Sequence, residues 1–599
     1  MPVAPNRRTV LRSSLALAAA LPLAGALPSA SASATPSDRP GAADLGPNVL
    51  LFDPSMGDAA IQAQVDSVFA TQQSNQFGTE RYALAFLPGT YNVDINVGFY
   101  THVLGLGAAP DDVVINGHVT VDAQWLGGNG TQNFWRAAEN LCIVPPDGLE
   151  RWAVAQAGPM RRAHIKGDMT LWPSPPGNRW SSGGFLADSV VDGQVDSGSQ
   201  QQWLSRNDRF GSWTGSNWNM VFVGTQGAPA QHFPNPAWTV VDATPTVREK
   251  PFLTRNADGS YQVFVPALRA DSAGPTWVSG PAAGHAVPLS RFHVARPGES
   301  AESINRALAR GQHLLLTPGV YPLAAPIRVR RPGTVVLGLG LATLQATNGN
   351  ALLEVGDVGG VSVAGILLEA ASAGSPVLLS VGEGRSRTRH VANPTVLFDV
   401  YARIGGAVAG GADVSVRIDS NDVICDNLWL WRADHGNDGT VGWTVNPADT
   451  GIEVNGDRVT AYGLAVEHYQ KYEVLWRGDH GRTYFFQNEH PYDVPTQSAW
   501  THDGTLGYAA YKVADTVTSH QAWGLGSYCF FDLNAGIYTD RAYEVPDTPG
   551  VVFTDLMTVC LNGPGGGGIL HCINASGAPV QNGFGTFYMT AYSDGAATP

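Results

Sequence analysis

The sequence predicts an all-β fold made of two tandem right-handed parallel β-helices, in which short strands wind into stacked coils. Composition is the first observation behind this prediction. Only 15% of the 599 residues are charged, whereas 70 are Gly and 40 are Pro, which is typical of short strands and tight turns. A long-range duplication and a regular strand spacing are the second and third observations. Hydrophobic residues make up 44%, enough to bury a large core.

The first 34 residues have the pattern of an export signal. The pair Arg7-Arg8 and a further Arg12 precede an Ala/Leu-rich run, and residues 30–34 are small. This order predicts a twin-arginine signal; a Sec-type signal with an incidental arginine pair is the alternative. Either signal predicts a secreted protein. No later stretch approaches the ~20 apolar residues of a transmembrane helix, so we expect no membrane partner.

The charge balance restricts the partners. Removing the three signal arginines lowers the formal net charge from −15 to about −18, because the signal carries no acid. Such a surface repels nucleic acid and anionic glycans such as pectate or alginate. We therefore expect a neutral polysaccharide as the partner, no nucleic acid, and a monomeric protein.

The duplication is visible in two segments of the same order. Residues 85–107 and 315–340 each read apolar strand, Pro-Gly-x-Tyr, a further strand and Gly-Leu-Gly. A plausible helix precedes each of them, at 58–71 and at 300–310. The second helix has Ser300 as its expected N-cap and an acid in its first turn.

The repeat divides the chain into two β-helical domains, which we expect at 43–288 and 289–599. Short strands separated by Gly, Asn and Asp follow within each domain, for example at 424–431 and 459–466. A coil period of roughly 20–25 residues favours a parallel β-helix. A sandwich or a propeller is the alternative, but propeller blades need a period of about 40–50 residues.

The cysteines do not form a disulfide framework. Five cysteines are scattered along the chain, and only Cys560 and Cys572 lie close together near the C-terminus. That pair is expected either to be bonded after export or to be two buried free thiols. No Cys-x-x-Cys or His-Glu-x-x-His spacing occurs, so the sequence predicts no metal and no cofactor.

Two carboxylates have the spacing of one solenoid coil. Glu467 and Glu489 are 22 residues apart, and each follows an apolar strand and precedes a histidine. Residues one coil apart lie above one another, so the pair is expected to share a face beside aromatic rings, as in sites that cleave sugars. The alternative for any single acid is a solvated loop position, which we expect for Glu473, Asp479 and Asp493.

The flanking residues add a resemblance. The segments Ala-Val-Glu467-His and Gln-Asn-Glu489-His-Pro-Tyr resemble elements of glycoside hydrolase family 55, the β-1,3-glucanases. Four further segments are similar to coils of that family, and together they span most of the mature chain. They are residues 152–157, 182–188, 200–207 and 427–435. The resemblance implies a duplicated β-helix without a cofactor.

The resemblance also implies a mechanism, namely inverting, exo-acting hydrolysis of β-1,3-glucan between the two β-helices. It implies that Glu489 is the general acid and that Glu467 belongs to the group that activates water. Gln156 and Ser182 are the first-half residues expected to help place that water, although a structural polar ladder is the alternative for both. The expected substrate-binding residues are Tyr492, His468, Trp431, Trp443 and Gln487; each tryptophan has a core position as its alternative.

One departure and two competing functions accompany this interpretation. His490 follows the acid where many relatives have a small or apolar residue, which is expected to affect the pKa of the acid or a neighbouring subsite. A polysaccharide lyase is the first alternative, but it needs Arg or Lys near an acidic sugar. A non-catalytic glycan-binding solenoid is the second, and it needs aromatic residues without an acid pair.

Overall fold

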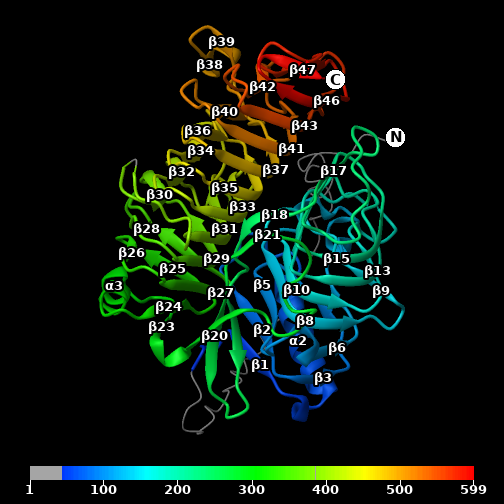
Figure 1. Ribbon diagram of the computed structural model, residues 1–599, viewed down its shortest axis with the longest axis vertical. Helices are drawn as coiled ribbons and strands as arrows, with labels where there is room; N and C mark the ends of the chain where they lie inside the picture. The colour runs from blue at the N-terminus through cyan, green and yellow to red at the C-terminus, as the bar shows by residue number, and fades with distance from the viewer. Residues whose placement is uncertain (1–43, 178, 385, 599) are drawn as a thin grey trace, which may run out of the picture.

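A computed structural model describes residues 44–177, 179–384 and 386–598, so the expected export signal at 1–34 lies outside the described residues. Two stacks of short parallel strands lie side by side, the first coloured blue to cyan and the second green to red (Figure 1). Within the described ranges the α-helices are α2 (Asp58–Gln72) and α3 (Ala301–Ala309). The predicted all-β parallel solenoid is confirmed.

The first stack is a 15-stranded sheet whose central strands follow one another from coil to coil. Each neighbouring pair along this path is parallel. The path runs through β1 (Val49–Phe52), β2 (Tyr82–Phe86), β5 (Thr101–Gly105), β8 (Arg136–Val144), β10 (Pro159–Ile165), β12 (Phe185–Ala187), β14 (Gln202–Arg206), β16 (Asn219–Val223) and β17 (Trp238–Val241).

The second stack has two long sheets, one on each side of its core. The first sheet, which carries the candidate site, contains β23 (Phe292–Ala295), β24 (His313–Leu316), β27 (Val335–Ala346), β29 (Ser362–Glu369), β31 (Val396–Ile404), β33 (Ile424–Arg432), β35 (Thr460–Glu467), β37 (Gly481–Glu489), β41 (His520–Cys529), β43 (Val551–Cys560), β46 (Gly585–Ser593) and β47 (Ala596–Thr598). The opposite sheet contains β26 (Ile327–Val329), β28 (Leu353–Val355), β30 (Ser375–Val381), β32 (Ala412–Ile418), β34 (Ala448–Val454), β36 (Val474–Trp476), β40 (Tyr511–Val513), β42 (Tyr538–Glu544), β44 (Gly568–Ile573) and β45 (Val580–Gln581).

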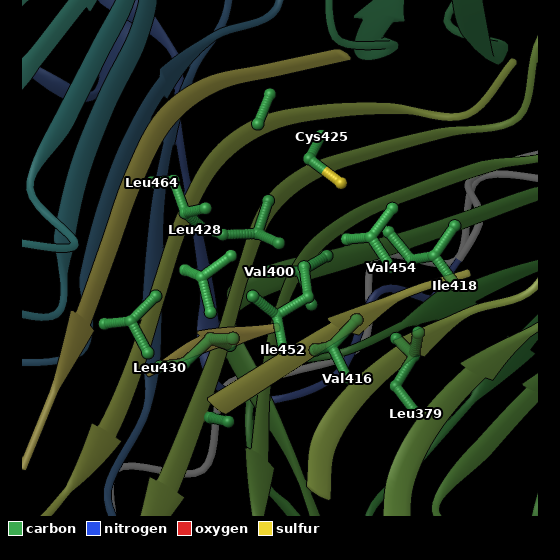
Figure 2. Packing of buried hydrophobic residues seen from close by; sticks show 14 of the residues in the cluster. Leu379, Val400, Val416, Ile418, Cys425, Leu428, Leu430, Ile452, Val454 and Leu464 are labelled. Carbon is green, nitrogen blue, oxygen red and sulfur yellow. The ribbon is translucent and has the colours of Figure 1, made fainter. Parts of the chain in front are cut away.

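A compact hydrophobic core fills the space between these two sheets. Figure 2 shows inward-pointing aliphatic side chains from successive coils, with Leu428 and Leu464 on one sheet and Val416 and Ile452 on the other. Because side chains alternate between the two faces of a strand, the residues between these apolar positions point out of the core. That alternation places the candidate site on the outer face of the first sheet.

The duplication seen in the sequence has a structural counterpart in two buried tyrosines. The hydroxyl of Tyr91 lies 3.0 Å from the carbonyl oxygen of Phe52, and that of Tyr321 lies 2.9 Å from that of Ala295. The glycines two residues before them have φ of 151° and 155°, and a Cβ on either would lie 2.3 Å from a proline ring carbon. Only glycine fits such a position, which explains why Pro-Gly-x-Tyr occurs twice.

The helices that precede the repeated unit also lie where the sequence predicts them. In α3, the side chain of Ser300 accepts a hydrogen bond from the amide of Ser303, as expected of an N-cap. Between the stacks the chain forms antiparallel strands, of which the last is β22 (Gly284–Pro288). The domain boundary at 288/289 falls directly after that strand and stays a prediction.

Buried ion pairs join the two stacks. The guanidinium of Arg161, on β10, lies 2.8 Å from carboxylate oxygens of both Asp399 and Asp426 in the second stack. Arg206, on β14, binds Asp426 at 2.9 Å and Glu249 at 2.7 Å. All five side chains are buried, so breaking any pair would leave an uncompensated charge. This network fixes how the outer faces of the two stacks meet.

The five cysteines are all buried free thiols, so the structure supports the free-thiol alternative for Cys560 and Cys572. Cys560 is instead the register partner of Cys529 on the neighbouring strand. No helix among the described residues is long and apolar enough to cross a membrane.

Candidate active site

The two carboxylates predicted from the one-coil spacing end adjacent strands. Glu467 is the last residue of β35 and Glu489 the last of β37, and the two are direct register partners. Neighbouring strands lie about 4.8 Å apart, so the two backbones are close. Val466 points into the core, and the alternation therefore directs Glu467 to the outer face, toward the first stack.

Glu467 is held by donors from both stacks. The amide of Gln156, in the first stack, donates a 2.8 Å hydrogen bond to Oε1, and the indole of Trp429 donates one of 3.0 Å to Oε2. The Gln156 amide also donates a 3.1 Å hydrogen bond to Oε1 of Gln487, which is the register partner of Ala465 on the next strand. The structure thus brings Gln156 together with Glu467 and Gln487, which lie 311 and 331 positions further along the sequence.

Ser182 lies in the first stack next to the Gln156 region. The Gln202 amide donates a 3.2 Å hydrogen bond to the hydroxyl of Ser182, and Ser182 is 2% exposed. The following residue, Gly183, has φ of +97°, and a Cβ on it would lie 3.3 Å from the side chain of Gln156. Glycine therefore permits the close approach between these two segments.

Glu489 has a different environment. The hydroxyl of Tyr492 donates a hydrogen bond to its Oε2, and Nε2 of His468 lies 3.7 Å from the same oxygen. The rings of His468 and Tyr492 meet edge to face, 4.4 Å apart. Glu489 is 8% exposed whereas Glu467 is 0% exposed. Of the two carboxylates, Glu489 is the one that a ligand can reach directly.

Two further side chains complete the site, and the sequence reasoning missed both. Trp429 binds Glu467, and Asp434 lies 3.8 Å from Nε2 of His468. Both lie in the segment 427–435 that carries the family resemblance. Trp429 and Trp431 are two residues apart on β33. Because side chains alternate along a strand, the sequence could have predicted that both lie on the outer face.

The two predicted tryptophan platforms differ in the structure. Trp431 is 0% exposed and packs with Trp429, Phe134 and Trp135 in an aromatic cluster between the stacks, so its environment is that of a core residue. Trp443 is only half-buried, and the guanidinium of Arg432 lies 5.6 Å from its ring centre. Trp443 is therefore the more accessible of the two rings.

The expectation that three acids of this region are solvated was wrong for Asp493 and Glu473, whereas Asp479 lies in a partly exposed turn. Asp493 forms a buried two-point ion pair with Arg432, at 2.8 and 2.7 Å. Glu473 is 1% exposed, and burial raises its pKa well above the usual range. Asp479 is partly buried and accepts a 2.7 Å hydrogen bond from the amide of Ser519, as is common where a tight turn crosses to the next coil.

His490 faces the core. Its ring packs edge to face with that of Trp500, at 5.6 Å, and its Nε2 lies 3.4 Å from the hydroxyl of Ser527. Burial lowers the pKa of His490 to about 3, so the ring is neutral. The backbone oxygen of His490 accepts a 3.1 Å hydrogen bond from Nδ1 of His468, so His490 contacts the site through its backbone and not through its ring.

Comparisons with known proteins found related sequences and structures that cover most of this chain. Residues 292–489 match the model of the LAM55 pectate lyase-like domain. The chain is 52% identical, over 90% of its length and 88% of the relative's, to an exo-beta-1,3-glucanase of Streptomyces sp. (strain SirexAA-E / ActE). It is also similar to the solved structure of sacteLam55A from Streptomyces sp. SirexAA-E, with 51% identity and a TM-score of 0.89 over 92% of this chain and 99% of that one. A variant of sacteLam55A in complex with glucose matches equally well.

Proposed function

Because the chain belongs to glycoside hydrolase family 55, the LAM55 family of β-1,3-glucanases, we propose that it hydrolyses β-1,3-glucan from the chain end. The observation that carries the proposal is the pair Glu467 and Glu489 at the ends of adjacent strands, facing the first stack. The exo action is that of the named relative, and the neutral substrate suits a chain with a net charge of −15.

Glu489 is the general acid of the proposed reaction. It protonates the leaving glycosidic oxygen as the bond to the anomeric carbon breaks. Its 8% exposure gives the leaving oxygen access to the carboxyl group, and the Tyr492 hydroxyl and His468 imidazole hold that group in place. A fixed donor avoids the reorganisation that an exposed side chain would need.

The attacking water is held on the other side of the sugar ring by Gln156 and Ser182, and Glu467 lies behind Gln156. The water oxygen bonds to the anomeric carbon and the water gives up one proton, for which we take Glu467 as the final acceptor. Because Glu467 is fully buried and bound to Gln156, the carboxamide oxygen of Gln156 takes the water proton while its Nε2–H passes to Glu467. The imidic acid left on Gln156 returns to the amide when Glu467 gives the proton back. Attack opposite to the leaving group inverts the anomeric centre, and such enzymes keep acid and base sides about 6.5–9.5 Å apart.

Substrate contacts surround the acid. Tyr492 and His468 lie against Glu489, and Gln487 is bound to Gln156 in the middle of the site. Trp443 offers a half-buried ring at the edge of this region. Trp431 packs in the buried aromatic cluster, so we assign it a supporting role instead of the sugar-stacking role expected from the sequence.

We further propose that the protein is exported and acts as a monomer on an extracellular polysaccharide. The arginine pair and apolar run of residues 1–34 support export. The negative net charge supports the exclusion of nucleic acid and of acidic glycans as partners.

The test is an incubation of the purified chain with laminarin, pectate and alginate. We expect glucose from laminarin alone. Unsaturated products that absorb in the ultraviolet would indicate a lyase, and retention of laminarin without any product would indicate a glycan-binding solenoid. Oligosaccharides longer than glucose as first products would contradict exo action and leave the hydrolase assignment intact.

A further inference from the structure

A cluster of metal-binding side chains lies on the outer face of the first stack. Cys142 on β8 and His164 on β10 are direct register partners, while their sequence neighbours Leu141, Ile143 and Ala163 fill the core. The alternation therefore points both Cys142 and His164 outward. Cys142 is nevertheless fully buried.

Asp111 completes the cluster from the preceding coil. It belongs to the short helical turn η3 (Pro110–Asp112), and its Oδ1 lies 2.7 Å from Nδ1 of His164. One donor atom from each of Asp111, Cys142 and His164 lies within 4.8 Å of the others. Ligands of a tetrahedral zinc ion are separated by roughly 3.3–3.8 Å, given bonds of about 2.0–2.3 Å. The Asp111 and His164 donor atoms are closer than this, at 2.7 Å, and a small rotation of the exposed Asp111 side chain away from His164 makes room for the ion between them.

Asp192 adds a carboxylate behind the histidine. Its oxygens lie 3.3 Å from Nε2 of His164, on the opposite side of the ring from Asp111. A metal-bound histidine commonly donates its second ring N–H to a carboxylate, which fixes the tautomer that leaves the other nitrogen for the metal. His164 already has this arrangement, with Nδ1 toward the cluster and Nε2 toward Asp192.

We propose that Asp111, Cys142 and His164 bind one Zn²⁺ ion, with Asp192 orienting His164 and a water molecule as the fourth ligand. A thiolate with an imidazole selects zinc or a similar transition metal over Ca²⁺ and Mg²⁺, which prefer oxygen ligands. Binding releases the thiol proton of Cys142, so affinity rises with pH. The ion cross-links successive coils of the first stack, away from Glu467 and Glu489, and has a structural role.

The sequence could not reveal this site. Its three ligands are separated by 31 and 22 residues, which matches no linear zinc motif. Only the stacking of coils brings the three ligands together. The prediction of no metal rested on linear motifs, and it therefore does not apply to this cluster. Lys166 would compete with the metal ion for Asp111, since its Nζ lies 4.0 Å from that carboxylate. The Lys166 side chain is 44% exposed, so it can turn away into solvent.

The experiment measures metal binding by the full chain in chelator-treated buffer. We expect one equivalent of Zn²⁺ per chain after gel filtration, and a rise in Tm of roughly 3 °C or more because the metal binds the folded state. Co²⁺ is the spectroscopic probe, with a thiolate-to-cobalt charge-transfer band expected at one equivalent. Cys142→Ala is expected to abolish the band and His164→Ala to weaken binding at least tenfold. Glucan hydrolysis without added metal is expected to be unchanged in both.

The matched control is His118→Ala, because His118 lies 3.7–3.8 Å from two carboxylates, of Asp147 and Glu150, in the same stack but has no cysteine beside it. It should retain the band and the stoichiometry of the unmodified chain. Should the unmodified chain show no charge-transfer band, or should Cys142→Ala bind Zn²⁺ as tightly as the control, the proposed site would be overturned. Thermal unfolding of each metal-free variant confirms that it is folded.

Discussion

The amide of Gln156 in the first stack donates a 2.8 Å hydrogen bond to the carboxylate of Glu467 in the second. The bond crosses between two stacks that could each bury a core alone. The candidate site therefore depends on how the stacks meet, and the buried ion pairs around Arg161 and Arg206 hold that arrangement. In the proposed mechanism, a duplicated solenoid thereby provides the water-placing Gln156 and Ser182 on one stack and the acid Glu489 on the other.

The first prediction concerns Gln156→Ala. We expect kcat on laminarin to fall about 100-fold, as for the loss of one fixed polar group at a reacting centre, with little change in KM. The reason is that Gln156 is proposed to position water rather than sugar. Steady-state kinetics of the variant tests this.

The control is Gln345→Ala, because the amide of Gln345 also donates a hydrogen bond to a glutamate, Glu369 at 2.7 Å, but between neighbouring strands of the second stack and far from the site. It should keep kcat within about twofold. An equal loss of kcat in the two variants would mean that such hydrogen bonds affect only the stability of the fold. An unchanged kcat in Gln156→Ala would show that this residue has no part in the mechanism.

The second prediction concerns Glu489→Gln. The substitution keeps the shape of the side chain but removes the transferable proton, so we expect kcat to fall by about 10³-fold or more. The circular dichroism spectrum and Tm should stay close to those of the unmodified chain. Glu544→Gln is the control, since Glu544 is a partly exposed residue at the end of a strand on the opposite sheet, paired with Lys512. Full turnover in Glu489→Gln would assign the acid elsewhere.

The third prediction is stereochemical. If water attacks opposite to the leaving group, the first glucose released from a β-linked substrate is the α-anomer. Proton NMR during the first minutes of hydrolysis, before mutarotation, distinguishes the anomers. An initial β-anomer would mean retention, and Glu467, as the register partner of Glu489, would then have to act as a nucleophile.

The fold was predictable because its determinants are local and repeated. Pro-Gly-x-Tyr occurs twice since each copy places a glycine against a proline ring and a tyrosine hydroxyl on backbone carbonyls. The one-coil spacing likewise predicted that Glu467 and Glu489 are neighbours, because register in a solenoid turns sequence distance directly into position.

The contacts between the stacks were not predictable in this way. Nothing in the sequence around Trp431 says that the first stack covers its ring. The burial of Asp493 was missed within the second stack, because no local pattern indicates that Arg432, 61 residues away along the chain, neutralises it. The family resemblance supplied Gln156 as a residue of the site, expected to help place the water, which neither spacing nor periodicity could provide.

The fourth prediction concerns the ion pairs between the stacks. Lys250 lies 2.6 Å from Glu139, and both side chains are about 5% exposed. Burial alone would raise the pKa of Glu139, but Lys250 and His102 outweigh it and hold the pKa well below its ordinary value of 4.5. We expect Lys250→Met to lower the free energy of unfolding by about 3–5 kcal/mol at pH 7, because the buried carboxylate loses its lysine partner and keeps, of these two groups, only the imidazole of His102, 3.1 Å away.

The sign of the pH dependence follows from the depressed pKa of Glu139. Its stabilising contribution is present above its unfolded pKa, near 4.5, and is lost as the pH falls below that value. The deficit of Lys250→Met should therefore shrink between pH 5 and pH 3.5, because the unmodified chain loses this contribution there, whereas Glu139 of the variant, whose pKa burial raises, is already protonated. Urea titrations at several pH values measure this. Lys512→Met, which breaks a partly exposed pair with Glu544, should cost no more than about 1 kcal/mol. A deficit for Lys250→Met that stays constant down to pH 3.5 would show that lost packing, rather than the unpaired charge, causes the destabilisation.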